Sequence, residues 1–174
     1  MRMNLKRRLA PCAPPGVDLG QELSWLACGG IVSLLYSFQF FIRYAKHYEQ
    51  LFLWDGISRV LDTSAVMPDF VDILGGSLSG FQVLALSMVA LAVYHYAYHF
   101  QGSKSIYLMK RFPDRWELLR RCITLPLLGA LACLCASALV LLTYYAIYMT
   151  FTPPACLAPG QWQRIWSLLP GVPV

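Results

Sequence analysis

The stretch that decides the fold is residues 101–121, QGSKSIYLMKRFPDRWELLRR, a basic segment between two long apolar runs. Residues 78–100 precede it and residues 122–151 follow it, and neither run contains an Asp, Glu, Lys or Arg residue. Roughly 20 apolar residues are enough to cross the hydrocarbon core of a bilayer. The sequence therefore predicts a short basic connection, residues 101–121, between two membrane spans.

The composition of the whole chain also indicates an integral membrane protein. Hydrophobic residues make up 57% of the 174 residues and charged residues only 13%, with a mean hydropathy of +0.52. Soluble domains carry about 25% charged residues. The net charge of +5 is better explained by orientation in an anionic membrane than by nucleic acid, because no basic stripe interleaved with aromatics remains outside the spans. No nucleic-acid partner is predicted.

A third apolar run, residues 23–42, is free of charge but contains Gly29 and Gly30 and is the least hydrophobic of the three. A cleaved signal peptide is the alternative, since basic residues precede this run. The run is longer than a typical signal-peptide core, and FQFFIRYAKHYEQ after it offers no small-residue cleavage site. The predicted fold is an all-α membrane protein, a single domain over residues 1–174, with spans at 23–42, 78–100 and 122–148.

The charges of the connecting segments predict the topology. Six basic and two acidic residues give residues 101–121 a charge of +4, and the first 23 residues hold four basic and two acidic residues. Residues 43–77 hold three basic and five acidic residues. Short loops rich in Lys and Arg stay in the cytoplasm. The amino terminus and residues 101–121 are therefore expected inside, and residues 43–77 and the tail 152–174 outside.

Two segments outside the spans show helical spacing of apolar residues. In residues 44–76 the pattern predicts an amphipathic helix on the outer membrane interface. In the tail, an aromatic-anchored interfacial turn and a helix packed on the core are equally compatible with the spacing. The residues concerned are Leu51, Trp54, Ile57, Val60 and Leu61 in the first segment and Trp162, Ile165, Trp166 and Leu169 in the tail.

Residue patterns typical of catalysis are missing, so the chain is predicted not to be an enzyme and to hold no cofactor. Residues 102–105, GSKS, lack the glycines of a phosphate-binding loop. His95 and His99 have the spacing of two metal ligands on a helix, but no Glu lies between them, and an aromatic interfacial belt is the favoured interpretation over a metal site. The six cysteines predict no disulfide, because only Cys156 is expected outside; the others are Cys12, Cys28, Cys122, Cys133 and Cys135.

The basic segment has internal structure. Residues 103–112 can form a short amphipathic helix, which Pro113 ends. Asp114 and Glu117 resemble a capping box, which predicts a new helix that runs through Trp116 into the third span. A solvated loop that serves only orientation does not need the apolar residues of this segment, whose exposure is costly unless lipid or a partner covers them. A docking surface for another protein is the alternative to that simple loop.

These residues resemble the loop after the second transmembrane helix of type 2 permeases of bacterial ATP-binding-cassette exporters. In that family a Lys-Ser pair, an amphipathic helix, a Pro and an Arg-containing start of the third helix follow one another. The match covers about 20 residues and the topology, and the chain departs from the family in having three predicted spans rather than six. The resemblance implies that residues 103–112 form a cytosolic coupling helix, with docking residues Lys104, Ser105, Ile106, Tyr107, Leu108, Met109, Phe112, Pro113 and Arg115.

The leading hypothesis is a non-enzymatic, multi-pass subunit of such an exporter in the bacterial plasma membrane. Its partners would be a separate ATP-binding subunit and a second membrane subunit or a second copy of this chain. Gly29, Gly30 and Gly129 are candidate helix-packing positions, and Pro126 is a candidate flex point in the third span. The alternative is a small membrane scaffold or regulatory subunit with no transport role. The predicted spans hold no charged residue that would identify a cargo.

Overall fold

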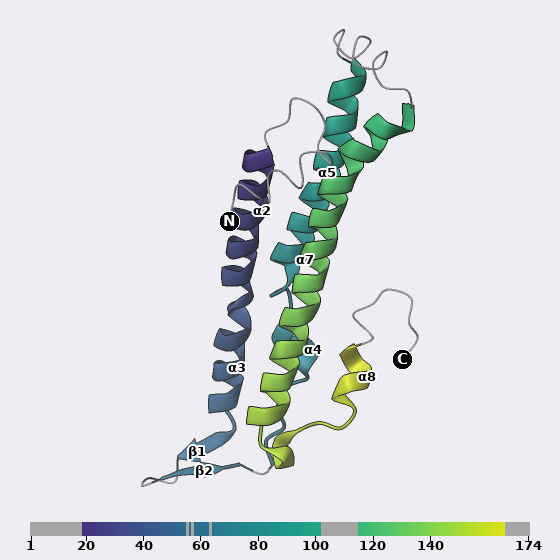
Figure 1. Cartoon of the computed structure of the whole chain (residues 1–174). Coiled ribbons are helices and arrows are strands. Elements are labelled where there is room, and N and C mark those ends of the chain that lie inside the picture. The colour runs from purple at the N-terminus through teal and green to yellow at the C-terminus, as the bar shows by residue number, and fades with distance from the viewer. Residues whose placement is uncertain (1–18, 55, 57, 63, 102–114, 166–174) are drawn as a thin grey trace. The chain divides into compact units, whose positions relative to one another are not determined.

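A computed structural model describes residues 19–101, except positions 55, 57 and 63, and residues 115–165 (Figure 1). The chain is mostly helical, at 77%. Three helices are long and apolar enough to cross a membrane, namely residues Gly20–Glu49, Ser79–Ala97 and Cys122–Phe151. The three predicted spans are therefore confirmed, although the first is longer than predicted at both ends. The all-α class needs one correction, because the chain also contains a two-stranded sheet.

The long helices follow the apolar runs closely. α2 (Leu19–Ser37) and α3 (Gln39–Glu49) are separated only at Phe38, whose backbone stays in the right-handed helical region at φ −61°. α5 covers Ser79–Gln101 and α7 covers Arg115–Phe151. The prediction that a new helix starts after Pro113 and runs into the third span is confirmed by α7. Pro126 lies inside this helix, where its missing N–H removes one backbone hydrogen bond.

The outward faces of these helices are apolar, which indicates a lipid environment. Large hydrophobic side chains are exposed along all three, and an apolar surface of this extent is costly in water. Examples are Ile31, Val32 and Leu35 on α2, Val83, Leu86 and Val93 on α5, and Leu127, Leu134 and Leu139 on α7. These three helices have the length and the apolar surface of membrane-spanning helices.

The chain divides into two compact units. Unit 1 comprises residues 1–34 and 80–137, and unit 2 comprises residues 35–79 and 138–174. In unit 1, α2 and α5 run in opposite directions, because Glu22 lies beside His95 while Gly29 faces Leu84. The core of unit 1 joins α5 to α7 and consists of Leu84, Ala85, Met88, Ala130 and Cys133, with Leu26 of α2 packed against it.

Glycines permit the close contacts of unit 1. A Cβ atom at Gly29 would lie 2.5 Å from Leu84 Cδ1, and one at Gly129 would lie 3.4 Å from Met88 Sδ. Gly80 was not singled out from the sequence, yet a Cβ atom there would lie 3.1 Å from Ser33 Cα. Two of the three predicted packing glycines thus contact helices of their own chain. Only Gly30 faces open space, with nothing within 4 Å of its Cβ position.

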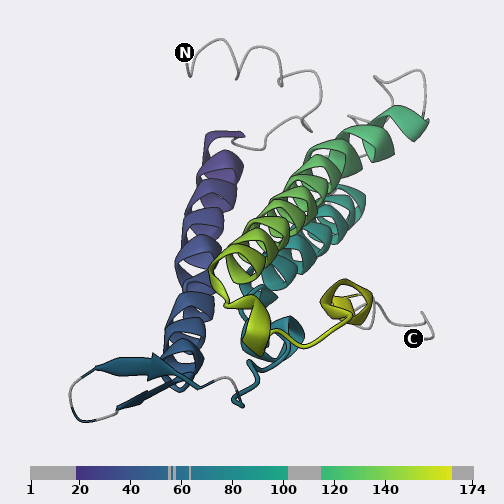
Figure 2. The same ribbon diagram turned by 90° about the horizontal axis from the view of Figure 1, so that it is seen from below.

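In unit 2, residues 52–61 form a β-hairpin and not the predicted amphipathic helix (Figure 2). β1 (Phe52–Trp54) pairs antiparallel with β2 (Arg59–Leu61), and Leu53 lies opposite Val60. The helix prediction is wrong because Gly56 has φ +74°, a left-handed conformation that turns the chain back on itself. Of the apolar residues that suggested a helix, Trp54 lies in β1, and Val60 and Leu61 lie in β2.

An aromatic cluster forms the core of unit 2. Phe40 of α3 stacks on Tyr144 with 4.5 Å between ring centroids and an interplanar angle of 7°. The Tyr144 hydroxyl lies 2.8 Å from Ser37 Oγ, and this contact is buried. Tyr148 is fully buried and donates its hydroxyl to the Pro68 carbonyl at 2.9 Å. Aromatic rings with polar ends suit this core, because the buried hydroxyls of Tyr144 and Tyr148 both have partners.

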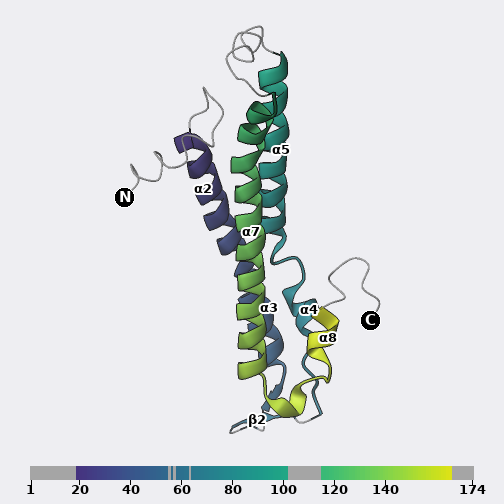
Figure 3. The same ribbon diagram turned by 45° about the vertical axis from the view of Figure 1, so that its right-hand side comes forward.

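The tail packs on α4 (Phe70–Leu74) through the short helix α8 (Gln161–Ile165), which lies beside it in Figure 3. The buried Gln161 accepts the Phe70 N–H at 3.0 Å through Oε1 and donates to Asp69 Oδ1 at 3.0 Å through Nε2. Arg164 forms an ion pair with the same carboxylate. Of the two interpretations of the tail, packing on the core is thus found for the described residues; Trp166 and Leu169 lie outside them.

A further bond joins the segment before the second span to the segment after the third. The Met67 N–H donates to the Cys156 carbonyl at 2.8 Å, next to the 3-10 helix η2 (Pro154–Cys156). α5 and α7 lie between these residues in the sequence, so a membrane crossed by both helices would have the two segments on one side. This agrees with the predicted placement of 43–77 and 152–174 on a common side.

The five described cysteines are all unpaired. Cys156 is buried, with Sγ 3.7 Å from the Asp62 carbonyl, so it stabilises the fold by packing. Cys133 is buried while Cys135 is exposed, as expected for two positions that face different directions on one helix. Cys12 lies outside the described residues.

Candidate functional site

The predicted docking residues 104–113 lie outside the described part of the chain, between the end of α5 at Gln101 and the start of α7 at Arg115. Arg115 is the first residue of α7. Residues 115–121, which were predicted as part of the connection, therefore belong to the third long helix. The described residues present a different candidate site, in unit 1.

This site is built around a buried carboxylate and imidazole. Glu22 Oε1 lies 2.9 Å from His95 Nε2, and the two side chains are only 12% and 7% exposed. α2 begins at Leu19, so Glu22 lies in its first turn and inside the first candidate span, which begins at Gly20. The predicted span excluded Glu22 because the charge-free run that delimited it begins at Leu23, whereas the helix begins at Leu19.

The hydrogen-bonding capacity of this pair is not filled. His95 Nδ1 is buried and has no hydrogen-bond partner among the described residues, and Glu22 Oε1 makes only the ion-pair contact without an aligned hydrogen bond. A buried polar atom left in this condition costs about 1–3 kcal/mol. Ionisable side chains inside membrane spans are rare and mark sites for ions, protons or substrates. The Glu22–His95 pair is therefore the leading candidate for a functional group.

The sequence interpretation of the histidines is only partly met. His95 is buried against Glu22, whereas the neighbouring Tyr94 and Tyr96 are exposed. The second candidate span ends at Ala97, so these residues lie near the end of the span, and the interfacial belt stays a prediction. The side chain of His99 lies outside the described ones. Within residues 19–101 and 115–165, apart from the masked positions, no group of three metal-binding side chains is found.

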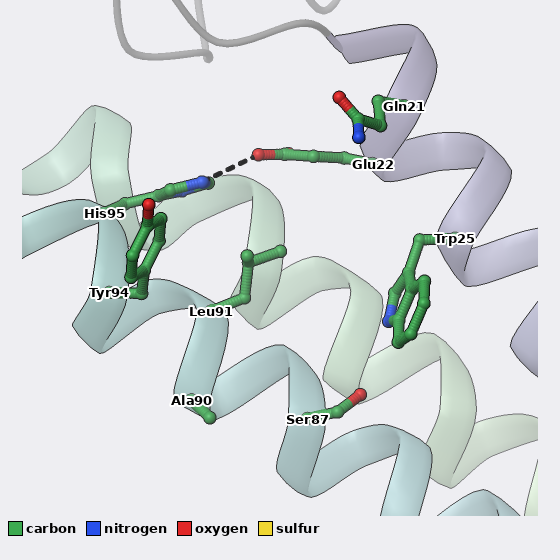
Figure 4. A pocket seen from close by; sticks show the side chains of 8 residues that line it. All are labelled: Gln21, Glu22, Trp25, Ser87, Ala90, Leu91, Tyr94 and His95. Atoms are coloured by element: carbon green, nitrogen blue, oxygen red, sulfur yellow. Dashed lines mark ion pairs between the residues drawn. The ribbon is translucent and has the colours of Figure 1, made fainter. Parts of the chain in front are cut away.

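A cavity of about 600 Å³ opens beside the pair (Figure 4). We call it the α2–α5 cavity. α2 contributes Gln21, Glu22 and Trp25, and α5 contributes Ser87, Ala90, Leu91, Tyr94 and His95. In Figure 4 the Glu22 and His95 side chains point toward each other across one end of the cavity, and Trp25 lies along α2 beyond them. The volume is within the range of small-molecule sites, about 300–1,000 Å³.

A smaller and almost wholly apolar cavity, of about 190 Å³, lies among α2, α5 and α7. Glu22 and Leu91 line both cavities. The other lining residues include Pro126, Gly129 and Ala132, whose small or absent side chains leave the space open. Glu22 therefore lies at the wall of both cavities of unit 1.

Sequence reasoning missed this site because Glu22 was used as the boundary of a span. A signal was present. Residues 22, 26, 29 and 33 recur at steps of four, three and four, which places them on one face of a helix. That face contains Leu26, Gly29 and Ser33. Leu26 packs on the core formed by α5 and α7, Gly29 faces Leu84 of α5, and Ser33 faces Gly80 of α5. A Glu on the packing face of an apolar helix predicts a buried carboxylate.

Comparison of the chain with protein-family models, curated proteins and solved structures finds no match.

Proposed function

We propose that this chain is a membrane subunit of a bacterial ATP-binding-cassette exporter and that it couples a separate ATPase to transport. The observation that carries the proposal is the segment SKSIYLMKRFPDR between two apolar helices, which resembles the coupling loop of type 2 permeases. Its position, after α5 and directly before α7, is the position of that loop in the family. The apolar residues of the loop are those that a docking surface requires.

The charge distribution supports the orientation in which this loop is cytoplasmic. The basic segments fall on one side and the acidic segment 43–77 on the other, with three crossings between the amino terminus and the tail. In this orientation the protein lies in the bacterial plasma membrane, and unit 2 contributes its folded hairpin, α4 and α8 to the outer side. ATP hydrolysis is left to the partner subunit.

The proposed mechanism is a mechanical one. Closure of the ATPase around ATP would move the loop, and α7 would transmit the movement because it begins at Arg115, directly after the docking residues. Pro126 supports bending within α7, since it removes a backbone hydrogen bond of the helix. The small residues of unit 1 allow the helices to slide at short distance. A second membrane chain would complete the translocation path, with the open face at Gly30 as the candidate contact.

A scaffold or regulatory subunit is the second candidate. The observation that favours it is the ordered unit 2, in which the tail is bonded to the segment before α5 by Gln161 and Cys156. Such a surface suits stable association with a larger membrane protein without any transport step.

The test is co-purification with an ATP-binding-cassette ATPase that is produced together with this chain, from a membrane fraction that contains both. Leu108→Asp should detach the ATPase while the chain still inserts, because loss of an interface anchor costs about 2 kcal/mol or more. Leu53→Asp is the matched control, since Leu53 is 59% exposed and lies in the outer hairpin. Equal recovery of the ATPase with both variants would refute the coupling role and favour the scaffold.

A further inference from the structure

The residues that line the α2–α5 cavity indicate which kind of ligand it can bind. Among the described residues that line it, Glu22 is the only acidic one, and none is Lys or Arg. A negative charge at the wall of an apolar cavity excludes anions and favours a cation. Most of the remaining surface is aromatic or aliphatic, from Trp25, Tyr94 and Leu91.

The Glu22–His95 pair also specifies a hydrogen-bond donor. In a neutral imidazole with its proton on Nε2, the nitrogen that lies 2.9 Å from Glu22 Oε1, Nδ1 is an acceptor. That atom is buried and has no partner among the described residues. The second carboxylate oxygen of Glu22 adds further acceptor capacity. The pair therefore lacks N–H donors, and an ammonium group supplies three.

Aromatic side chains complete the recognition of a cation. Trp25 is 63% exposed and lines the cavity one turn along α2 from Glu22. The face of a Trp ring attracts ammonium groups through its quadrupole. Beyond the charged end, Leu91 and Ala90 give an apolar wall for a hydrocarbon chain.

We propose that the α2–α5 cavity binds a protonated primary amine that carries an apolar chain, with its ammonium group beside Glu22, His95 and the Trp25 ring and its chain along Leu91 and Ala90. This inference goes beyond the exporter proposal and holds equally for a scaffold, because it needs no ATPase. The natural source is either a lipid with an amine headgroup or a free amphiphilic amine.

The test is equilibrium binding of radiolabelled dodecylammonium to the full chain in a neutral maltoside detergent, with empty micelles subtracted. One saturable site per chain is expected, and dodecanol, which has the same chain without the charge, should show none. Glu22→Gln should weaken binding at least tenfold, and Trp25→Ala about twofold to thirtyfold. Glu49→Gln removes the same charge from a residue that does not line the cavity and should leave the Kd unchanged.

Ala90→Trp tests the cavity without touching the charged pair, and it decides the matter if Glu22→Gln does not remain monodisperse. Filling the space should abolish saturable binding. Competition identifies the source: displacement by phosphatidylethanolamine indicates a lipid headgroup, and displacement by hexylamine alone indicates a free amine. Binding that is unsaturable, unaffected by both Glu22→Gln and Ala90→Trp, or displaced by neither amine would overturn the proposal.

Discussion

The two units of this chain treat buried polar groups differently. In unit 2, the hydroxyls of Tyr144 and Tyr148 and the amide of Gln161 all have partners, and large aromatic rings fill the core. The Ser77 hydroxyl is the exception among the described residues of this unit, because it is buried and has no hydrogen-bond partner. In unit 1, the core consists of small and aliphatic residues, both cavities described above are found there, and Glu22 and His95 keep unfilled hydrogen-bonding capacity. Satisfied and closely packed regions are the more stable parts of proteins, whereas functional sites retain strain. We therefore assign rigidity to unit 2 and ligand chemistry to unit 1.

The largest test of this contrast is Tyr148→Ala in unit 2. The change removes a fully buried ring and leaves the Pro68 carbonyl without its donor. Loss of a buried aromatic side chain typically costs about 3–5 kcal/mol. Thermal unfolding in detergent should show a large decrease of the midpoint, while Met149→Ala, at a side chain that is 40% exposed, should change it little. Similar midpoints for the two variants would contradict the role of Tyr148 in the core of unit 2.

An intermediate effect is expected from a matched pair of glycines in unit 1. Gly29→Leu places atoms against Leu84 in the core and should lower the free energy of unfolding by about 1–3 kcal/mol, as overpacking does. Gly30→Leu meets nothing within 4 Å and should change it by about 0.5 kcal/mol or less.

The same two variants test whether a second membrane chain packs against Gly30. If that chain packs at Gly30, then Gly30→Leu should dissociate the assembly in native mass measurements without lowering the stability of the monomer. Loss of monomer stability in Gly30→Leu, equal to that of Gly29→Leu, would contradict the packing described for α2.

The smallest effect concerns pH and the exposed turn after β2. Hydrogen bonds from the Ser64 hydroxyl and backbone N–H to Asp62 Oδ1 hold the pKa of this carboxyl below its ordinary 3.8. A group with a lowered folded-state pKa contributes stability above about pH 3.8 and loses it as the pH falls through the lower value. Carboxyl NMR titration should find the lowered pKa in the wild type and a higher one in Ser64→Ala. An identical pKa in both would exclude this hydrogen bond as the cause.

Much of the fold can be predicted from the sequence because helices that face lipid consist of long runs of apolar residues. Charge-free runs predicted the three long helices. The capping-box pattern of Asp114 and Glu117, directly after Pro113, predicted the start of α7. The hairpin could not be predicted in the same way, since its apolar residues are also at helical spacing and only the φ of Gly56 separates the two structures. The bonds of Gln161 to Asp69 and Phe70 join residues about 90 positions apart, and no local pattern indicates them.

The candidate site was missed for a related reason. Span boundaries were drawn at charged residues, a rule that assumes every charge prefers water. Glu22 contradicts the rule because His95, on another helix, provides it with a partner. The pairing of α2 with α5 is a tertiary contact, so the sequence alone does not predict that Glu22 and His95 lie together.

The bond between Met67 and Cys156, together with the contacts of Gln161, has a consequence for biosynthesis. A ribosome completes residues 67–70 long before residues 156–161, and two membrane helices must be inserted in the interval. Until then the Phe70 N–H and the Asp69 carboxylate lack the partners that the tail supplies. Completion of unit 2 is thus coupled to correct insertion of α5 and α7: a chain that fails to place α7 across the membrane leaves this surface open to proteases, which could then remove the misinserted product.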